Sequence, residues 1–304
     1  MLKLQKVKKS YGRKMVLDQL DLEVENGTIF GITGGAGAGK TTLCRMIAGL
    51  IQADEGKIMA AGEDMAHDPE NIRKKVGYVP KEFGRYRDMD PEEYLDYYGR
   101  LYGLSGEHTG DKIEKLLEMV GLAAQRQEQV EKLKLCEKKR LALARCLLED
   151  IDVLVLDDFL VDLDPRERKE IDPLLFQIRD MGKAVLISSP GFSALTGEEE
   201  SLGILQEGKI VVQGSLEEIS EQVNCSNPLE LVTAEKSTKA IEVLKEEDTV
   251  TRISIDGHKI LAGFQGTQED QVRILKCLME QGVPVVSFQR RKSDLESVFW
   301  KMTE

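Results

Sequence analysis

The 304-residue sequence has few residues of the kinds that build disulfide frameworks or thiolate metal centres. Its cysteines are scattered and odd in number, and they stand at Cys44, Cys136, Cys146, Cys225 and Cys277. None forms a C-x-x-C pair, whereas zinc sites and small secreted domains need closely spaced or paired cysteines. We therefore expect free thiols in a reducing compartment. The three histidines are dispersed as well, and a surface position is expected for each.

Long apolar runs and an excess of basic residues are also missing. No stretch approaches the ~20 apolar residues that span a bilayer, and the start, Met1 to Lys6, lacks the apolar core of a signal peptide. Any membrane role is therefore expected to come through a partner. Lys and Arg total 42 against 54 Asp and Glu, a net charge of −12. Non-specific nucleic-acid binders are more often basic, so we expect no nucleic-acid partner.

A glycine-rich turn between a short apolar run and a helix-like stretch is the most informative feature present. The apolar run is 28–33, and the stretch after the turn carries Leu43, Met46, Ile47 and Leu50 at helical spacing. The turn itself reads Gly34, Gly35, Ala36, Gly37, Ala38, Gly39, Lys40, Thr41, Thr42. Strand, glycine-rich loop and helix in this order are the context of a phosphate-binding P-loop.

Each residue type in this loop has a physical task at a phosphate. Glycines let the backbone fold into a nest of N–H groups around phosphate oxygens, and the new helix directs its positive end at the same oxygens. Lys40 would reach the β- and γ-phosphates, and the Thr41 hydroxyl would ligate Mg²⁺. The loop therefore predicts a nucleotide-binding site.

The rest of the first 223 residues indicates an α/β domain. Residues 2–24 alternate as antiparallel strands with a turn near Tyr11, and further strands are expected at 56–60 and 75–79. An all-helical piece at about 91–150 precedes the next strand. That strand, 153–156, is wholly apolar, as a buried parallel strand is. Asp157 follows it, and an acid there usually holds Mg²⁺.

The pattern resets at 224–228, and a second domain, 224–304, is expected there. The predicted order is strand, helix, strand, strand, helix, strand, which is the split β-α-β-β-α-β order. A last helix would place Leu295, Val298, Phe299 and Met302 on one face. At 304 residues the chain is long for one core and suits two domains.

These features resemble the ATP-binding subunit of an ABC transporter, with the match covering about residues 1–222. The segments that carry the resemblance are Tyr11, the P-loop, the helical insert, Asp157, Arg140-Leu141-Ala142-Leu143-Ala144-Arg145 in the position of the signature helix, Leu163-Asp164-Pro165 in that of the D-loop, and 209–218. The tail, with 295–299, is similar to the extension of bacterial drug- and ion-export members. The expected fold is a P-loop ABC-type domain, with a mixed sheet, an antiparallel β subdomain and a helical subdomain, plus a small α+β ferredoxin-like domain.

The resemblance implies a set of ligands and partners. ATP and Mg²⁺ would be the cofactors, with Tyr11 stacking on the base, Val16 in the same nucleotide-binding set, Thr41 and Asp157 on the metal, and Asp158 as the catalytic carboxylate. It implies a dimer with itself or with a different chain, formed through the nucleotide face. It also implies membrane-spanning transporter subunits as partners, which would hold a cytoplasmic chain at the inner face of the membrane.

Four departures from the family pattern fall on positions that sense or attack the γ-phosphate. Lys81 stands where a glutamine is usual, and an ammonium has no lone pair with which to ligate Mg²⁺. The signature Leu-Ser-Gly-Gly-Gln is replaced at 133–137 by Leu-Lys-Leu-Cys-Glu. Asp158 replaces a glutamate, and Pro190 replaces the switch histidine. A look-alike at 104–107 is interpreted as a loop. The binding half is therefore expected to be intact and the hydrolytic half altered.

Three functions remain open from the sequence. The first is an exporter subunit with weak or lost turnover, docking on its partner around residues 83–97. The second is a nucleotide-gated regulatory or scaffold protein that does not power transport. The third, an ABC-type protein of DNA repair or ribosomes, is the least favoured, because the chain has neither a long coiled-coil insertion nor a second ATP domain.

Overall fold

The chain divides into two compact units, Met1–Leu216 and Glu217–Glu304. The predicted boundary at 223–224 falls outside the residues that the structure describes. The computed structural model describes residues 1–66, 73–104, 106–191, 195, 199–215, 218–219, 229–235, 237–264 and 266–290.

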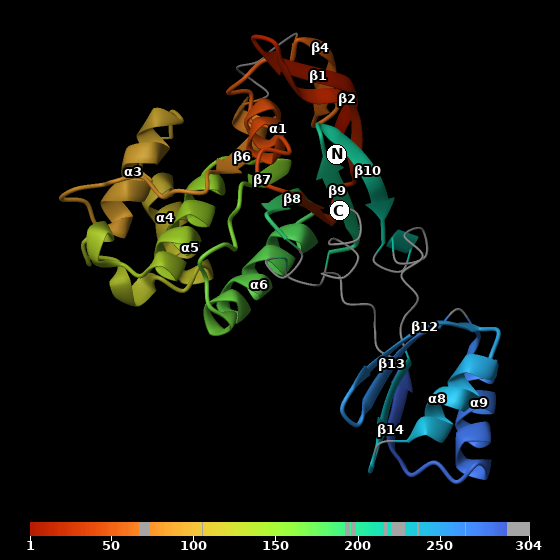
Figure 1. Ribbon diagram of the computed structural model, residues 1–304. Helices are drawn as coiled ribbons and strands as arrows, with labels where there is room; N and C mark the ends of the chain where they lie inside the picture. The colour runs from red at the N-terminus through yellow and green to blue at the C-terminus, as the bar shows by residue number, and fades with distance from the viewer. Residues whose placement is uncertain are drawn as a thin grey trace. The chain divides into compact units, whose positions relative to one another are not determined.

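The first unit begins with an antiparallel sheet in the order β2-β1-β4-β5 (Figure 1). Its strands are β1 (Leu2–Tyr11), β2 (Lys14–Val24), β4 (Glu55–Ala60) and β5 (Glu63–Asp64). Leu2 pairs with Val24 and Leu4 with Leu22 across β1 and β2, and these four side chains are buried. Alternation of apolar and polar residues thus produces a sheet with one buried face. The predicted strands at 2–24 and 56–60 are confirmed, whereas β5 was not predicted.

A six-stranded sheet in the order β10-β9-β3-β8-β7-β6 forms the centre of this unit. Its strands are β3 (Ile29–Thr33), β6 (Val76–Val79), β7 (Val153–Leu156), β8 (Ala184–Ser189), β9 (Ser201–Gln206) and β10 (Lys209–Gly214). Neighbouring strands from β9 to β6 run parallel, and β10 pairs antiparallel with β9. The sheet is therefore mixed, as expected. Because β3, β6, β7 and β8 are parallel, their carboxyl ends meet at one edge.

Helix α1 (Lys40–Ile47) follows β3 directly and packs on the central sheet beside β7 and β8. It is shorter than predicted, because Leu50 lies beyond its end and is exposed. Helix α6 (Pro165–Asp180) follows β7. Asp164 caps it by accepting hydrogen bonds from the backbone N–H groups of Arg166 and Glu167, which satisfies donors that the helix leaves unpaired.

The helical insert consists of α3 (Pro91–Leu101), α4 (Glu107–Met119) and α5 (Leu135–Cys146), with short turns η1 (Ala123–Gln125) and η2 (Val130–Lys132). Helices α4 and α5 begin two or three residues before the predicted starts near residues 110 and 137. The look-alike at 104–107 accordingly runs into the first residue of α4 instead of lying wholly in a loop. Among the described residues, no helix is both long and apolar enough to cross a bilayer.

The second unit contains a four-stranded antiparallel sheet in the order β12-β13-β11-β14. Its elements are β11 (Leu229–Thr233), α8 (Thr238–Glu246), β12 (Val250–Asp256), β13 (Lys259–Phe264), α9 (Gln268–Glu280) and β14 (Val285–Arg290). The predicted β-α-β-β-α-β order is confirmed. Leu231, Leu244, Phe264, Ile274 and Leu278 belong to its own buried core. The last predicted helix, at 295–302, lies outside the described residues.

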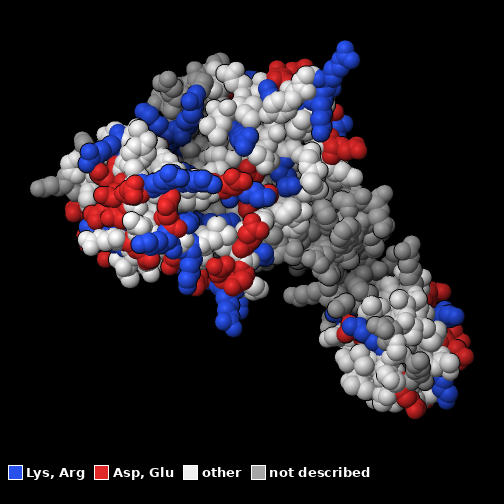
Figure 2. Space-filling view, turned by 60° about the vertical axis from the view of Figure 1, so that its left-hand side comes forward, with Lys and Arg blue, Asp and Glu red and all other residues white. Residues whose placement is uncertain are grey.

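Charged side chains of both signs are interspersed on the face of the first unit that Figure 2 shows. Lysine and arginine side chains alternate there with aspartate and glutamate side chains over the helical insert. This arrangement is that of an ordinary solvated surface.

Because each unit has its own core, a chain that ends at Gln222 should remain folded. We expect it to unfold in one cooperative thermal transition and to bind nucleotide like the full chain. A matched control that ends at Gln206 removes β10, which pairs with β9, and should be clearly less stable. Aggregation or a non-cooperative transition of the Gln222 chain would show that the second unit is needed by the first.

Candidate functional site

The loop between β3 and α1 leads into the N-terminus of α1, in the strand–loop–helix order that the sequence predicted. Gly39 has a φ of 111° and stands at the N-cap of α1 without any side-chain cap. The first N–H groups of α1 are therefore left without a capping side chain, at the positive end of the helix dipole. No acidic residue occupies the first turn of α1 to neutralise this end. Such a terminus is suited to an anion.

The glycines of the loop are required by its close packing and its backbone angles. A Cβ on Gly34 would lie 2.2 Å from the Leu205 carbonyl oxygen, and one on Gly39 would lie 2.9 Å from that of Val16. Gly37 has a φ of 80°, which favours glycine, but a Cβ there would meet no atom within 4 Å. The loop is thus packed tightly against β9 and β2 on one side and open on another.

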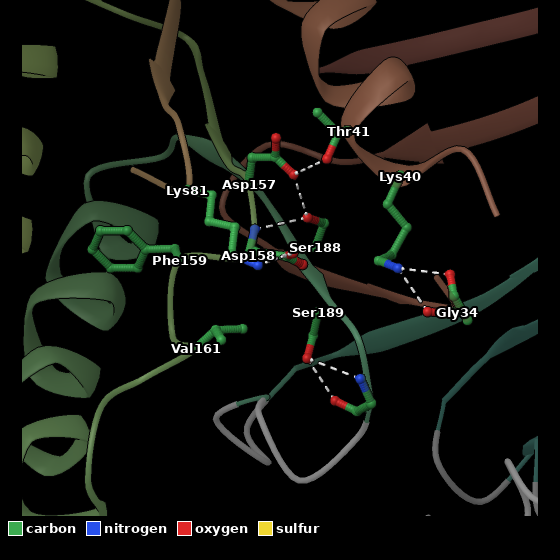
Figure 3. A network of polar contacts seen from close by, with 12 residues as sticks. Gly34, Lys40, Thr41, Lys81, Asp157, Asp158, Phe159, Val161, Ser188 and Ser189 are labelled. Carbon is green, nitrogen blue, oxygen red and sulfur yellow. Dashed lines mark hydrogen bonds and ion pairs between the residues drawn. The ribbon is translucent and has the colours of Figure 1, made fainter. Parts of the chain in front are cut away.

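Lys40 is buried and turned back over this loop. Its Nζ donates hydrogen bonds to the carbonyl oxygens of Gly34 at 2.6 Å and Gly35 at 3.1 Å (Figure 3). Burial lowers the pKa of Lys40, while the charges of Asp158 and Asp157 act in the opposite sense. The ammonium is therefore held beside the open loop by neutral carbonyls, which a phosphate would replace with a stronger, charge-assisted partner.

Asp157 joins three elements around the tip of β7. Its Oδ1 accepts hydrogen bonds from Thr41 Oγ1 at 3.1 Å and Ser188 Oγ at 3.0 Å (Figure 3). Its Oδ2 accepts one from the Tyr78 hydroxyl at 3.2 Å. Only 2% of Asp157 is exposed. Burial, followed by the charge of Asp157, raises the pKa of Tyr78, so this phenol stays a donor. The structure thus brings together Thr41 and Asp157, the two predicted metal ligands.

Asp158 is paired with Lys81, an ion pair that the sequence analysis did not foresee. Lys81 Nζ lies 3.5 Å from Asp158 Oδ2, and the side chains are 53% and 15% exposed, respectively (Figure 3). The Asp158 backbone is left-handed, with a φ of 46°, and its N–H donates to Ser188 Oγ at 2.9 Å. Its Oδ1 is buried without a hydrogen-bond partner among the described residues. The carboxylate is therefore neutralised by a cation from the opposite loop.

Oxygen donors suited to Mg²⁺ are present, but the set is incomplete. The Thr41 hydroxyl and the Asp157 carboxylate are hard oxygen groups of the kind that this metal prefers, and they lie within hydrogen-bond distance of each other. Lys81 reaches the neighbouring acid with an ammonium, which cannot ligate a cation. Thr41 and Asp157 could therefore ligate Mg²⁺, whereas the positive charge of Lys81 would repel it.

Helix α5 connects the helical insert to the loop after β7 through Lys139, which the sequence analysis did not single out. Lys139 is only 5% exposed, and its Nζ donates hydrogen bonds to the carbonyl oxygens of Phe159 and, at 2.9 Å, Val161. Burial lowers the pKa of Lys139 to about 8, although the charges of Asp162 and Asp158 raise it. The sequence signal that could have identified Lys139 is its position as a lysine inside a helix that begins at an altered signature.

The start of α5 occupies the position of the family signature. Lys134 is its N-cap, and the Glu137 carboxylate accepts a hydrogen bond from the Lys134 backbone N–H at 2.7 Å. Glu137 therefore places its own negative charge at the positive end of α5, where a phosphate would otherwise be favoured. Cys136 is buried, with its Sγ 3.6 Å from the Glu167 carbonyl oxygen, and burial raises the pKa of its thiol to about 11. Leu135 is partly exposed.

The remaining predicted site residues lie at the rim. Tyr11 ends β1, is 50% exposed, and has Lys9 Nζ 5.8 Å from its ring centroid. Val16 is half-buried on β2, beside Gly39. Pro190 is exposed and directly follows β8, so it contributes no side-chain donor to the edge where Asp157 and Asp158 lie. Tyr11 was expected to be exposed near a turn, and that position is confirmed.

Comparison with known proteins places these features in a family. The profile described as "ABC transporter" matches residues 17–161. The chain is 30% identical to Nod factor export ATP-binding protein I of Cupriavidus metallidurans, over 99% of this chain and 97% of that protein. It is 23% identical to linearmycin resistance ATP-binding protein LnrL of Bacillus subtilis, over 100% and 98%, respectively.

Solved structures show the same fold. An ATP-binding subunit of an ABC transporter matches with a TM-score of 0.65 at 23% identity, over 73% of this chain and 92% of that one. A dimeric ATP-binding cassette in a post-hydrolysis state with ADP and Pi matches with a TM-score of 0.63 at 23% identity, over 71% and 98%, respectively.

Replacing Lys139 should change how stability depends on pH. The pKa of Lys139 is about 8 in the fold against 10.5 as its ordinary value, so the unfolded chain binds more protons between these values. The free energy of unfolding should therefore rise with pH in this window because of Lys139. Urea unfolding at about pH 7.5 and about pH 9.5 should show a smaller rise for Lys139→Met than for the parent chain.

Lys138→Met is the matched control, because Lys138 lies on the same helix and donates to the Glu131 carbonyl oxygen. Its rise in stability should equal that of the parent. An equal rise in all three proteins would contradict a lowered pKa for Lys139.

Proposed function

Since the chain belongs to the ABC transporter family as an ATP-binding subunit, we propose that it binds Mg-ATP and couples it to separate membrane-spanning subunits of an export system, with weak or lost hydrolysis. The observation that carries this proposal is the contrast within one site. The P-loop would hold the phosphates, and Thr41 and Asp157 would supply two metal ligands, whereas Asp158 is paired with Lys81. The export role follows the names of relatives, which concern Nod factor export and linearmycin resistance.

ATP binding is supported by groups that are already in place. The residues proposed to bind the nucleotide are Tyr11, Val16, Gly34, Gly35, Ala36, Gly37, Ala38, Gly39, Lys40, Thr41 and Thr42. The N-terminus of α1 has no side-chain cap, and the Lys40 ammonium lies on the carbonyl oxygens of Gly34 and Gly35, where a phosphate could replace them. Tyr11 offers an exposed ring on which the adenine would stack.

Magnesium would be held by Thr41 and Asp157. When bound there, it would neutralise charge on the phosphates. Tyr78 and Ser188 donate to Asp157, so they position the carboxylate rather than bind the ligand. Together with Thr41, these donors satisfy the buried carboxylate, whose burial would otherwise be costly.

Weak turnover is proposed because the group that should activate water is already engaged. Asp158 is one methylene shorter than the usual glutamate and is paired with Lys81 at 3.5 Å. Its Oδ2 lies beside Lys81 and its Oδ1 is buried, so the carboxylate is poorly placed to take a proton from water. General-base catalysis contributes about 10²–10⁴-fold, and a displacement of about 1 Å can cost about 10²-fold. Pro190 adds no donor that could replace the missing histidine.

The surface offered to a second subunit carries its own changes. A homodimer would bring the α5 start, with Lys134, Leu135 and Glu137, to an ATP held beside Asp158 and Lys81, so both sites would be defective. In a heterodimer, one site would lack its catalytic carboxylate and the other its signature. Both arrangements predict slow hydrolysis.

The membrane-spanning partner is proposed to dock between the Lys81 loop and the helical insert, around residues 83–97. A small pocket lies there, lined among others by Phe83, Tyr86, Leu135 and Arg145. The rings of Phe83, Tyr86 and Tyr94 are in mutual contact. A surface that combines aromatic rings with an arginine suits contact with a protein partner.

The alternative is a nucleotide-gated regulatory or scaffold protein that does not power transport. The alterations on both the P-loop side and the α5 side favour it. A chain selected only to bind ATP needs neither an intact catalytic carboxylate nor an intact signature. Co-purification separates the two, since an exporter subunit should retain a multi-span membrane protein and a scaffold should not.

Replacing Lys40 should weaken ATP binding. Lys40→Ala deletes the charge-assisted contact to the phosphates, which is worth about 1.5–3 kcal/mol, so affinity should fall roughly 10–100-fold. Isothermal titration with Mg-ATP measures this change. Lys57→Ala, an exposed lysine on β4, should bind like the parent. Equal affinity of Lys40→Ala and the parent would sink the assignment of the P-loop.

Restoring the residues that the family uses for hydrolysis should raise the ATPase rate cooperatively. Asp158→Glu alone should raise the ATPase rate little, because Lys81 and Pro190 still fail to position water and phosphate. The combination of Lys81→Gln, Asp158→Glu and Pro190→His should raise it by more than the single changes multiplied together, as cooperating residues do. Steady-state phosphate release measures each rate. Brisk hydrolysis by the parent chain would show that these residues are tolerated variants.

A further inference from the structure

We propose that the Lys81 ammonium contacts the terminal phosphates of ATP and replaces most of the charge neutralisation that Mg²⁺ provides, so that this P-loop holds ATP nearly as well without the metal as with it. The inference depends on the proposed ATP binding and concerns which cation accompanies the nucleotide. Lys81 then becomes a ligand-contacting residue instead of merely the loss of a metal ligand.

Lys81 is placed at the same edge of the sheet as the P-loop. It stands two residues beyond β6, whose end lies beside the end of β7, because Val79 pairs with Leu156. Its Nζ is 3.5 Å from Asp158 Oδ2, and Asp158 shares Ser188 as a partner with Asp157. Figure 3 shows Lys81 reaching toward Asp158 from the loop opposite Thr41.

The charges at this edge are already balanced without a metal. Lys40, Lys81 and Lys139 are the cations, and Asp157, Asp158 and Asp162 are the anions. Without Lys81, the carboxylates would outnumber the ammonium groups, and an incoming triphosphate would need a further cation. The field of Lys81 extends to the P-loop: burial is the main cause that lowers the pKa of Lys40, and the positive charge of Lys81 also lowers it.

Lys81 can reach a phosphate without rearrangement of the fold. Its side chain is 53% exposed and belongs to a flexible four-carbon stem. An ammonium has three N–H donors, and the ion pair with Asp158 is the polar contact that the described residues supply to it. The ammonium can therefore bridge Asp158 and a phosphate oxygen through different N–H groups.

The same ammonium makes Mg²⁺ binding at this site less favourable. A cation beside Asp158 repels a dication at Asp157 and supplies no lone pair. Thr41 and Asp157 remain as ligands, so Mg²⁺ binds with fewer protein oxygens than its geometry can use. Both effects reduce the gain in ATP affinity that the metal brings.

The test compares ATP affinity with Mg²⁺ and with excess EDTA for the full chain and its variants, measured with ATP itself by isothermal titration calorimetry. For the parent, the dissociation constant should change by less than about threefold on removal of Mg²⁺. For Lys81→Gln, which is neutral and restores an amide oxygen, it should change by about tenfold or more, as expected for loss of one charged contact. Lys81→Arg, which keeps the charge, should behave like the parent.

Two controls make the outcomes distinct. Lys57→Gln removes a lysine charge on β4, away from the loop, and should keep the parent's ratio. Thermal unfolding of each variant checks that the loss of the Lys81–Asp158 pair leaves the fold intact, and Lys81→Met gives a second neutral variant should Lys81→Gln unfold.

The inference is overturned if the parent loses about tenfold or more of its affinity in EDTA, or if Lys81→Gln and Lys81→Met keep the parent's ratio. In those cases Mg-ATP binding itself still stands. If the parent binds ATP under neither condition, the proposed function fails as well, which the Lys40→Ala comparison shows independently.

Discussion

The buried carboxylate of Asp157 is the constraint on which the rest of the site depends. It accepts hydrogen bonds from Thr41 on α1, Ser188 on β8 and Tyr78 on β6. An ionised group this deeply buried is tolerated only with such partners. By satisfying it, the fold fixes the start of α1 against the carboxyl ends of β6, β7 and β8. The P-loop is therefore held open and preorganised by the same contacts that stabilise the sheet edge.

Asp158, the next residue, is a second carboxylate with different contacts. Asp158 is neutralised by a lysine from another loop instead of being held by several neutral donors. The first arrangement suits a group that must stay charged and fixed near a ligand. The second leaves Asp158 with one oxygen beside an ammonium and the other buried, which is a poor arrangement for taking a proton from water. The two adjacent acids thus differ in role. Asp157 belongs to the part of the site that would bind the nucleotide, and Asp158 to the part that would activate water.

The fold could be predicted from the sequence wherever the signal is local. Apolar alternation located β1 and β2, the apolar run 153–156 located β7, and the glycine pattern located the start of α1, because each depends on neighbouring residues. Helix starts moved by two or three residues, since caps such as Lys134 with Glu137 are set by side-chain geometry. The pairs Lys81–Asp158 and Lys139–Phe159 join segments far apart in the chain. Sequence showed Lys81 as a departure but could not show where its charge goes.

The central claim is that this chain holds ATP without consuming it. The most direct measurement is the identity of the nucleotide retained by the purified full chain after incubation with Mg²⁺ and ATP, released by denaturation and separated by chromatography. The account predicts intact ATP, close to one molecule per chain, that persists while an active family member would have produced ADP. Recovery mainly of ADP, with phosphate released at the rate of an ordinary ABC ATPase, would contradict it.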